Sequence, residues 1–233
     1  MKRILITGAN RGIGLALVQH WLSHSPHQVF ATYRRLEDAS TLQALAADYP
    51  QRLVMLRLEL ADERSMNEAV ETLSEQIQTL DILVNNAAID PQPQSLDKIG
   101  PQTLSLIYSI NTIAPLMLTR ALLPLMQTSE APVIVNMSSE MASLALRDYG
   151  GSYGYCASKA ALNMDARGLA AELGPQGFIV IALDPGWVRT DMGGPNATLE
   201  PEESARGIVS VIDGLTPAQN GHFLVYDGSE HPW

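Results

Sequence analysis

The sequence predicts an α/β protein with a doubly wound sheet of seven parallel strands, helices on both faces and a single domain over residues 1–233. Seven short apolar runs alternate with longer amphipathic segments, as in sheets built from βαβ units. A glycine-rich turn joins the first apolar run to the first amphipathic segment. The length also fits, because α/β folds often run to ~250 residues as one domain.

The apolar runs are short and mostly aliphatic, which is typical of parallel strands that are buried on both faces. They predict strands over residues 3–7, 28–33, 53–60, 81–85, 133–138, 178–183 and 222–226. Because each run is followed by a helical segment, consecutive strands are joined by right-handed crossovers.

The segments between the strands have helical periodicity, and some carry start or stop signals. Asp62 is typical of an N-cap with Glu63 in the first turn, and Gly174-Pro175 stops a helix before the sixth strand. Helices are predicted over residues 12–23, 36–49, 63–78, 103–126, 151–173 and 201–213. The glycine- and proline-containing stretch at about 187–203 predicts a mobile loop.

Composition excludes several classes of protein. Fifteen basic and 25 acidic residues give a net charge of −10, which does not suit phosphate backbones, so no nucleic-acid partner is expected. A single cysteine, Cys156, excludes a disulfide within the chain. The apolar start of the chain breaks at Thr7, which is too early for a signal peptide. The sequence has no uninterrupted run of ~18 apolar residues, so no membrane span is expected. We therefore expect a cytoplasmic protein.

The glycine-rich turn predicts dinucleotide binding in a Rossmann-type fold. It has the spacing Gly-x-x-x-Gly-x-Gly and lies between the first strand and the first helix. Glycines there let the backbone approach a phosphate, and the helix N-terminus adds partial positive charge. The alternative is a turn that is merely tight. The residues predicted to bind the cofactor here are Gly8, Asn10, Arg11, Gly12, Ile13 and Gly14.

The end of the second strand favours NADP(H) over NAD(H). NAD sites of this kind usually place a carboxylate there, to accept from the ribose 2′-hydroxyl. Here the strand ends in Arg34 and Arg35, and Arg11 lies in the glycine turn. Guanidinium groups suit a 2′-phosphate through charge-assisted hydrogen bonds. The alternative is that Arg34 and Arg35 are ordinary surface charges.

Tyr155 and Lys159 form a candidate catalytic pair. Positions i and i+4 share one face of a helix, so the phenol and the ammonium can approach one another. A free tyrosine has a pKa of ~10, and a neighbouring cation lowers it. The pair therefore predicts a phenol that exchanges protons with a carbonyl or alcohol oxygen near neutral pH.

With these motifs in place, the chain resembles the short-chain dehydrogenase/reductase family, in its single-domain branch. The matching motifs occur in the family's order. They are Thr7 to Gly14, Asn85-Asn86-Ala87-Ala88, Asn111, residues 134–139 ending in Ser139, the Tyr155 and Lys159 pair, and residues 184–190. Residues 155–164 and 185–195, with a long segment between Ser139 and Tyr155, resemble the C-factor and sniffer-like carbonyl reductase subgroup. That subgroup includes carbonyl reductases and proteins discussed as signals.

The resemblance implies roles for further residues. Ser139 polarises the substrate carbonyl, with Ser138 as the rival position. Asn111 corresponds to an asparagine that holds a water in the proton path to Lys159, which itself binds the ribose; alternatively Asn111 bonds to its own backbone. The remaining cofactor contacts implied are Glu59, Leu60, Asn86, Ala87, Ala88, Pro185, Gly186, Val188 and Thr190. Glu59 stands where the family more often has an aspartate, and Ala88 where the family has a glycine, so the chain departs from the family's pattern at these two positions.

The loop at about 187–203 is expected to cover the substrate. The predicted pocket walls, apolar or aromatic, are Met141, Leu146, Tyr149, Trp187 and Met192. The alternative is ordinary packing within the loop. No metal site is expected, because His20 and His24 share a helix face without a third ligand. Cys156 is expected to be a packing residue.

Together these features predict an NADPH-dependent reductase acting on a small-molecule ketone or aldehyde. One alternative is a dinucleotide-binding signalling or scaffold protein of the C-factor type with little catalysis. Another is a dehydratase or epimerase of the longer branch, for which too few residues follow Thr190. Relatives pair their two long central helices, so a homodimer or homotetramer through 103–126 and 151–173 is expected, with a monomer as the alternative.

Overall fold

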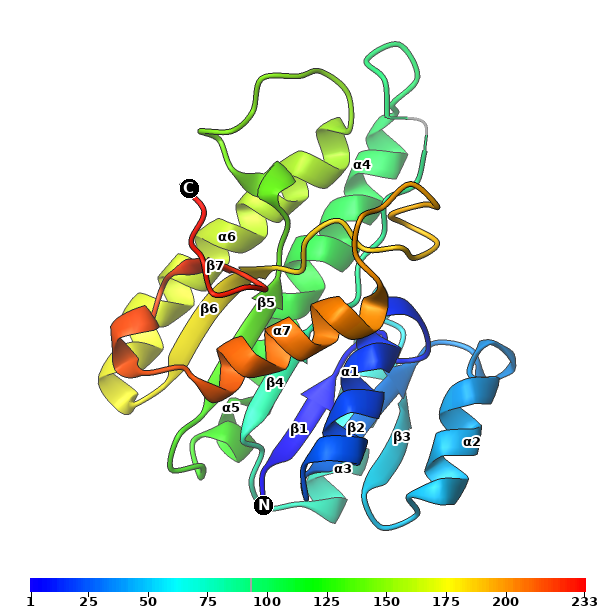
Figure 1. Ribbon diagram of the computed structural model, residues 1–233, viewed down its shortest axis with the longest axis vertical. Coiled ribbons are helices and arrows are strands. Elements are labelled where there is room, and N and C mark those ends of the chain that lie inside the picture. Colours follow the sequence, from blue (N-terminus) through cyan, green and yellow to red (C-terminus); the bar gives the residue numbers. More distant parts are fainter. Residues whose placement is uncertain (93) are drawn as a thin grey trace.

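The computed structural model describes residues 1–92 and 94–233. Seven parallel strands form one sheet in the order β3-β2-β1-β4-β5-β6-β7 (Figure 1). The strands are β1 (Arg3–Ile6), β2 (Gln28–Tyr33), β3 (Leu53–Arg57), β4 (Ile82–Asn85), β5 (Val133–Met137), β6 (Ile179–Asp184) and β7 (Phe223–Val225). The strand order reverses between β1 and β4, which is the topological switch point at which doubly wound sheets bind ligands. The predicted fold class is confirmed.

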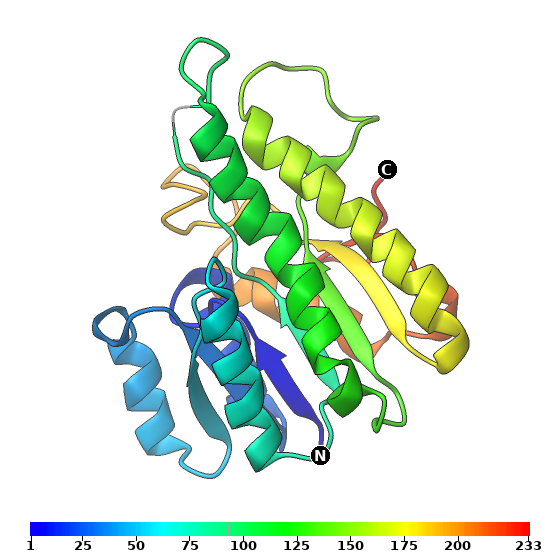
Figure 2. The same ribbon diagram turned by 180° about the vertical axis from the view of Figure 1, so that it is seen from behind.

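Helices cover both faces of the sheet, as Figures 1 and 2 show from opposite sides. One face carries α1 (Gly12–His24), α2 (Ser40–Asp48) and α7 (Pro201–Asp213). The other carries α3 (Glu63–Gln76), α5 (Ala114–Met126) and α6 (Tyr153–Leu173). Successive strand residues feed the two resulting cores. In β1, Ile4 and Ile6 pack with the first layer, and Leu5 packs with the second.

Most predicted elements are confirmed to within a few residues, including the Asp62 N-cap, whose carboxylate accepts a hydrogen bond from the Arg64 N–H at 3.0 Å. Three elements differ, two of them near the ends of β2 and β3. The third strand ends at Arg57, not at residue 60. The predicted helix over 36–49 is divided into a 3-10 turn, Leu36–Asp38, and α2. The Asp38 carbonyl accepts from the Asn10 side chain at 3.0 Å, so this turn is tied to the glycine-rich loop.

The predicted helix over 103–126 contains a π turn. It consists of α4 (Pro101–Tyr108), a π-helical segment (Ser109–Ile113) and α5. Pro115 has no N–H to donate to the Asn111 carbonyl four residues earlier, and a wider turn accommodates that missing bond. The full segment is long and apolar enough to cross a membrane by length and composition alone. Half of its most apolar window is buried, as in the core helix of a globular protein.

Candidate active site

A cleft of about 1350 Å³ opens at the carboxyl ends of the strands. It collects segments that are far apart in the sequence: the glycine-rich turn after β1, the ends of β2 and β3, the loop after β4, the segment after β5, and the loop after β6. Tyr155 and Lys159 enter it from α6. All the predicted cofactor residues line this cleft.

The glycine-rich turn is anchored to β2 and β4. The Thr7 hydroxyl accepts from the N–H groups of Asn86 at 2.9 Å and Ala87 at 3.0 Å. The Gly8 N–H donates to the Thr32 hydroxyl at 3.1 Å. Gly8 has a φ of +64°, a conformation that favours glycine. Within the described chain, the Arg11 side chain makes no capping bond to α1, and the first-turn residues Gly12, Ile13 and Gly14 line the cleft. Their N–H groups are therefore not taken up by an Arg11 cap, as a phosphate site requires.

Replacement of Gly14 by alanine is expected to lower both stability and dinucleotide affinity. A Cβ there would lie 2.5 Å from the Gly8 carbonyl oxygen and 2.6 Å from the Asn86 amide nitrogen, and neither can retreat freely. Overpacking of this kind costs about 1–3 kcal/mol. Gly168→Ala in α6 is the control, because nothing lies within 4 Å of its Cβ position, and it should raise stability by up to ~1 kcal/mol. Equal melting temperatures for the two variants would contradict the prediction.

Two of the three arginines predicted to contact a 2′-phosphate, Arg34 and Arg35, line the cleft just after β2. Arg34 Nε is 3.9 Å from a Glu59 carboxylate oxygen, and Arg35 lines the cleft next to it. Arg11 faces the loop after β6, where its guanidinium bonds Asp191 at 2.6 Å. The Ser65 hydroxyl accepts from the Glu59 N–H at 2.9 Å, which holds that backbone against α3. Ala88 keeps a negative φ, so the missing glycine causes no strain there.

Tyr155 and Lys159 face the same cleft, as their spacing predicts. Lys159 Nζ lies 5.8 Å from the centre of the Tyr155 ring and donates to the Met137 carbonyl oxygen at 2.6 Å. Both side chains are buried. The bond to Met137 connects α6 to the end of β5.

The predicted lowering of the Tyr155 pKa is wrong. Burial raises that pKa well above its usual range, and the carboxylates of Asp90 and Asp184 raise it further. A hydrogen bond with Ser139 lowers it without outweighing burial. Burial also lowers the pKa of Lys159 to about 8. The sequence argument failed because it counted the neighbouring cation and not the loss of water around the phenol.

The two adjacent serines have different surroundings. The Ser138 hydroxyl is buried and donates to the Asn163 side chain at 2.6 Å. The Ser139 hydroxyl accepts from the Met141 N–H at 3.2 Å, and it is near enough to the Tyr155 phenol to lower the pKa of that phenol. Ser139 is therefore the serine placed beside the phenol.

Asn111 lies in the π turn, fully buried and outside the residues that line the cleft. Its side chain accepts from the Ile89 N–H at 2.9 Å and donates to the Ile89 carbonyl at 2.9 Å. It also donates to the Ser158 hydroxyl at 3.1 Å. The alternative that Asn111 bonds its own backbone is wrong, because its amide instead fastens the loop after β4 to α6.

Two functional candidates were missed by sequence reasoning. Gln94 is buried, and its side-chain oxygen accepts from the Tyr155 N–H at 2.9 Å at the start of α6. The Gln94 amide also donates to Asp90, a half-buried carboxylate in the cleft. Both lie in a loop without periodicity or a recognisable motif, so only the folded chain reveals their proximity to Tyr155.

All but one of the residues predicted to form the substrate pocket line the cleft. Met141, Tyr149, Trp187 and Met192 line the cleft. Leu146 does not line it and is 45% exposed, so its assignment to the pocket is wrong. Its N–H donates to the Ser143 hydroxyl at 3.3 Å, in a turn that faces solvent.

The histidines and the cysteine singled out in the sequence lie as follows. The rings of His20 and His24 stack at 4.4 Å on α1. Over residues 1–92 and 94–233, no three His, Cys, Asp or Glu side chains form a group that could hold a metal ion. Cys156 is buried, and Arg147 donates to its sulfur at 2.6 Å.

A parallel sheet with this switch point, a glycine-rich turn and a Ser-Tyr-Lys group in one cleft define an NAD(P)-dependent oxidoreductase. Residues 2–200 match the short chain dehydrogenase family, and the chain belongs to it.

Three relatives describe this membership further. The C-signal of Myxococcus xanthus is 42% identical over 154 residues, which cover 66% of this chain and 93% of that protein. The carbonyl reductase Sniffer of D. melanogaster superposes with a TM-score of 0.95 at 36% identity, over 100% of both chains. An NADPH-bound carbonyl reductase from chicken fatty liver also gives 0.95 at 36% identity, over 100% of this chain and 99% of that one.

Proposed function

We propose that this protein reduces the carbonyl group of a ketone or aldehyde with NADPH. The observation that carries the proposal is the presence of Ser139, Tyr155 and Lys159 in the same cleft as the glycine-rich turn. Two structural neighbours with TM-scores of 0.95 are named carbonyl reductases, and one of them holds NADPH. The apolar walls Met141, Trp187 and Met192 favour a substrate with an apolar or aromatic body.

Each polar group has a role in the reaction. When bound, NADPH supplies the hydride for the carbonyl carbon. Ser139 donates a hydrogen bond to the carbonyl oxygen and stabilises the negative charge that develops there. Tyr155 keeps its proton at neutral pH because its pKa is raised, and it gives that proton to the alkoxide, a stronger base. Lys159 binds the ribose hydroxyls while Met137 fixes its ammonium. Asn111 positions the loop after β4.

The rate of reduction is expected to fall as pH rises through about 8. Burial lowers the pKa of Lys159 to about 8, so its ammonium is lost in that range, whereas Tyr155 is still protonated. A pH–rate profile from about pH 6 to about pH 10 at saturating NADPH measures this. A rate that is flat through about pH 9 would show that the Lys159 charge does not matter.

NADPH is proposed as the preferred cofactor because Arg34 and Arg35 line the cleft where β2 ends. Removing both as Arg34→Ala/Arg35→Ala is expected to raise KM for NADPH by roughly tenfold to a hundredfold, since each bond from a guanidinium to a charged group is worth about 1.5–3 kcal/mol. KM for NADH should change little. Arg64→Ala on α3, which removes an exposed ion pair with Glu68, is the control. An unchanged ratio of the two KM values would refute the assignment.

The deciding experiment measures NADPH oxidation with a panel of aliphatic and aromatic ketones and aldehydes. Turnover with at least one supports the reductase. The second candidate is a dinucleotide-binding signalling or scaffold protein, which the similarity to the C-signal favours. Binding of NADPH without oxidation by any panel member would support that candidate instead.

We further propose that the protein forms a homodimer or homotetramer through its long central helices. Leu106, Ile113 and Met164 are exposed on α4, the π turn and α6. A sedimentation measurement that finds only monomer at micromolar concentration would overturn this.

A further inference from the structure

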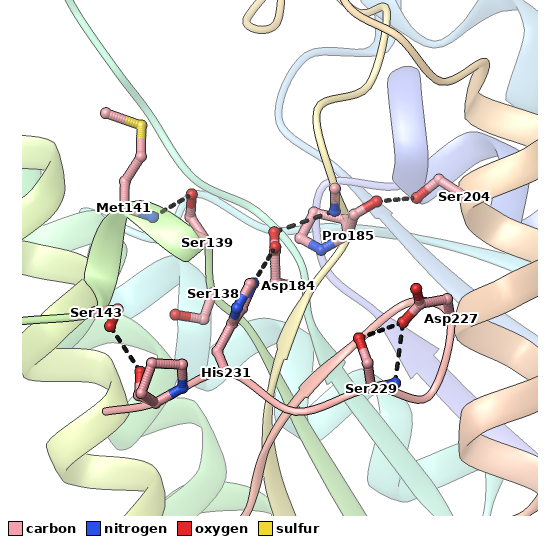
Figure 3. A network of polar contacts seen from close by, with 12 residues as sticks. Ser138, Ser139, Met141, Ser143, Asp184, Pro185, Ser204, Asp227, Ser229 and His231 are labelled. Atoms are coloured by element: carbon pink, nitrogen blue, oxygen red, sulfur yellow. Dashed lines mark hydrogen bonds and ion pairs between the residues drawn. The ribbon is translucent and has the colours of Figure 1, made fainter. Parts of the chain in front are cut away.

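The last residues of the chain fold back over the active-site end of the sheet (Figure 3). After β7 a tight turn forms, in which the Asp227 carboxylate accepts from the Ser229 N–H at 2.9 Å and the Ser229 hydroxyl at 2.6 Å. The chain then runs antiparallel to β7, and the His231 N–H donates to the Phe223 carbonyl at 2.9 Å. Residues 231–233, here called the clasp, are thereby brought between the segments that follow β5 and β6.

His231 makes the first connection of the clasp. Its Nε2 donates to one carboxylate oxygen of Asp184 at 2.8 Å, and both side chains are largely buried. The other oxygen of Asp184 accepts from the Gly186 N–H at 3.1 Å. Asp184 therefore connects His231 to the Pro185-Gly186 turn through its two carboxylate oxygens, and that turn lines the cleft. The Pro185 carbonyl is fixed from the opposite side by the Ser204 hydroxyl at 2.7 Å.

The backbone of Pro232 and Trp233 makes the second connection. The Ser143 hydroxyl donates to the Pro232 carbonyl at 2.6 Å. The N–H groups of Leu144 and Ala145 donate to the Trp233 carbonyl at 2.9 Å and 3.3 Å. Residues 143–145 follow the short helical turn Glu140–Ala142, which begins next to Ser139. This connection therefore holds the segment after β5, which carries Ser139 and Met141, against the clasp.

Aromatic packing holds the clasp in place. The Trp233 ring lies 5.4 Å from the ring of Phe223, and the His231 ring lies 5.1 Å from it. The Arg167 guanidinium of α6 sits 5.3 Å from the centre of the Trp233 ring. Phe223 itself is fully buried in the sheet. The clasp is thus seated on β7 and α6, the rigid elements beside the cleft.

We propose that the clasp is a positioning element of the active site, with His231 as its central positioning residue. It holds the wall after β5, with Ser139, and the turn after β6, with Pro185 and Gly186, at a constant separation. The expected change in kcat rests on the proposed reductase function. The expected change in amide exchange does not depend on that function. Without His231, one oxygen of the buried Asp184 carboxylate loses its hydrogen-bond donor. The carboxylate is then free to turn, and the hydrogen bond from the Gly186 N–H to its other oxygen is weakened.

The test compares His231→Ala with His231→Gln, whose side-chain amide can still donate to Asp184. His222→Ala is the matched control, because His222 pairs with Glu230 on the surface and contacts neither wall. We expect His231→Ala to lower kcat by roughly tenfold to a hundredfold with little change in KM for the carbonyl substrate, as misplacement by about 1 Å does. His231→Gln should recover most of the loss, and His222→Ala should equal the wild type.

Amide hydrogen exchange supplies a readout that is independent of turnover. The Gly186 amide should exchange faster in His231→Ala, by roughly tenfold or more, and normally in His222→Ala. Ser143→Ala leaves the Asp184 contact intact and should accelerate exchange at Leu144 and Ala145, and at Leu146, whose N–H loses the Ser143 hydroxyl, but not at Gly186. It therefore decides the matter if His231→Ala does not fold. Unchanged exchange at these amides, or unchanged kcat in His231→Ala, overturns the clasp. A wild type that oxidises no NADPH overturns the reductase proposal, while the exchange measurement still tests the clasp.

Discussion

Tyr155→Phe is expected to lower kcat for carbonyl reduction by roughly 10²- to 10⁴-fold, the usual contribution of a positioned proton donor. The phenol is buried in α6 beside Ser139, and its raised pKa keeps the proton on the oxygen at neutral pH. Phenylalanine fills the same space but has no proton to give. The Kd for NADPH should stay within about threefold of wild type, because losing one hydroxyl of many contacts costs under ~1 kcal/mol.

Tyr153→Phe is the matched control for this prediction. Tyr153 is the first residue of α6, lies two residues before Tyr155 and is 39% exposed outside the residues that line the cleft. Its kcat should equal that of the wild type. Single-turnover kinetics with preloaded NADPH separate the chemical step from cofactor binding. If Tyr155→Phe turns over as fast as Tyr153→Phe, another group protonates the product and the proposed mechanism is wrong.

Lys159→Met should remove most activity and at the same time stabilise the fold. Lys159 is 2% exposed, and burial lowers its pKa to about 8. The charged ammonium therefore lowers the free energy of unfolding at neutral pH. Methionine fills similar space without that cost, and the free energy of unfolding at pH 7 should rise by roughly 1–3 kcal/mol. The Met137 carbonyl loses its donor, which offsets part of the gain. Loss of the ribose contact should raise KM for NADPH.

The stability gain has a defined pH dependence. The unfolded chain keeps the Lys159 proton up to about pH 10.4, whereas the folded chain loses it near pH 8. Between these values the unfolded state binds more protons, so this group makes the wild type more stable as pH rises. Melts at about pH 7 and about pH 9.5 should therefore show the advantage of Lys159→Met shrinking. Lys98→Met, at an exposed lysine, should show neither effect; a constant advantage at both pH values would contradict the argument.

The features predictable from sequence were those fixed by local spacing. The strand-turn-helix around Gly8 and Gly14, the i, i+4 placement of Tyr155 and Lys159, and the seven parallel strands follow from periodicity and motif order. Apolar runs and glycines constrain backbone geometry wherever they occur, so these predictions needed no tertiary information.

The features that escaped prediction depend on long-range packing. The Tyr155 pKa depends on how much water reaches the phenol and on Asp90, 65 positions earlier along the chain. Gln94 and His231 reach the site through long-range hydrogen bonds made by loops with no periodic pattern. Leu146 was assigned from residue type alone, and a turn directed it to solvent. The catalytic roles themselves stay predictions until the variants are measured.

The sheet order has a kinetic consequence. β1 pairs with β4, and the Arg3 N–H donates to the Asp81 side chain, a contact between residues 78 positions apart. Sheets with such non-local pairing fold slowly, since long loops must close before any contact stabilises them. β7 is one of the two edge strands and docks on β6 through three residue pairs. A chain in which β1 to β6 pair before β7 docks lacks the contact of His231 with Asp184, so it should bury most of the sheet before it gains activity.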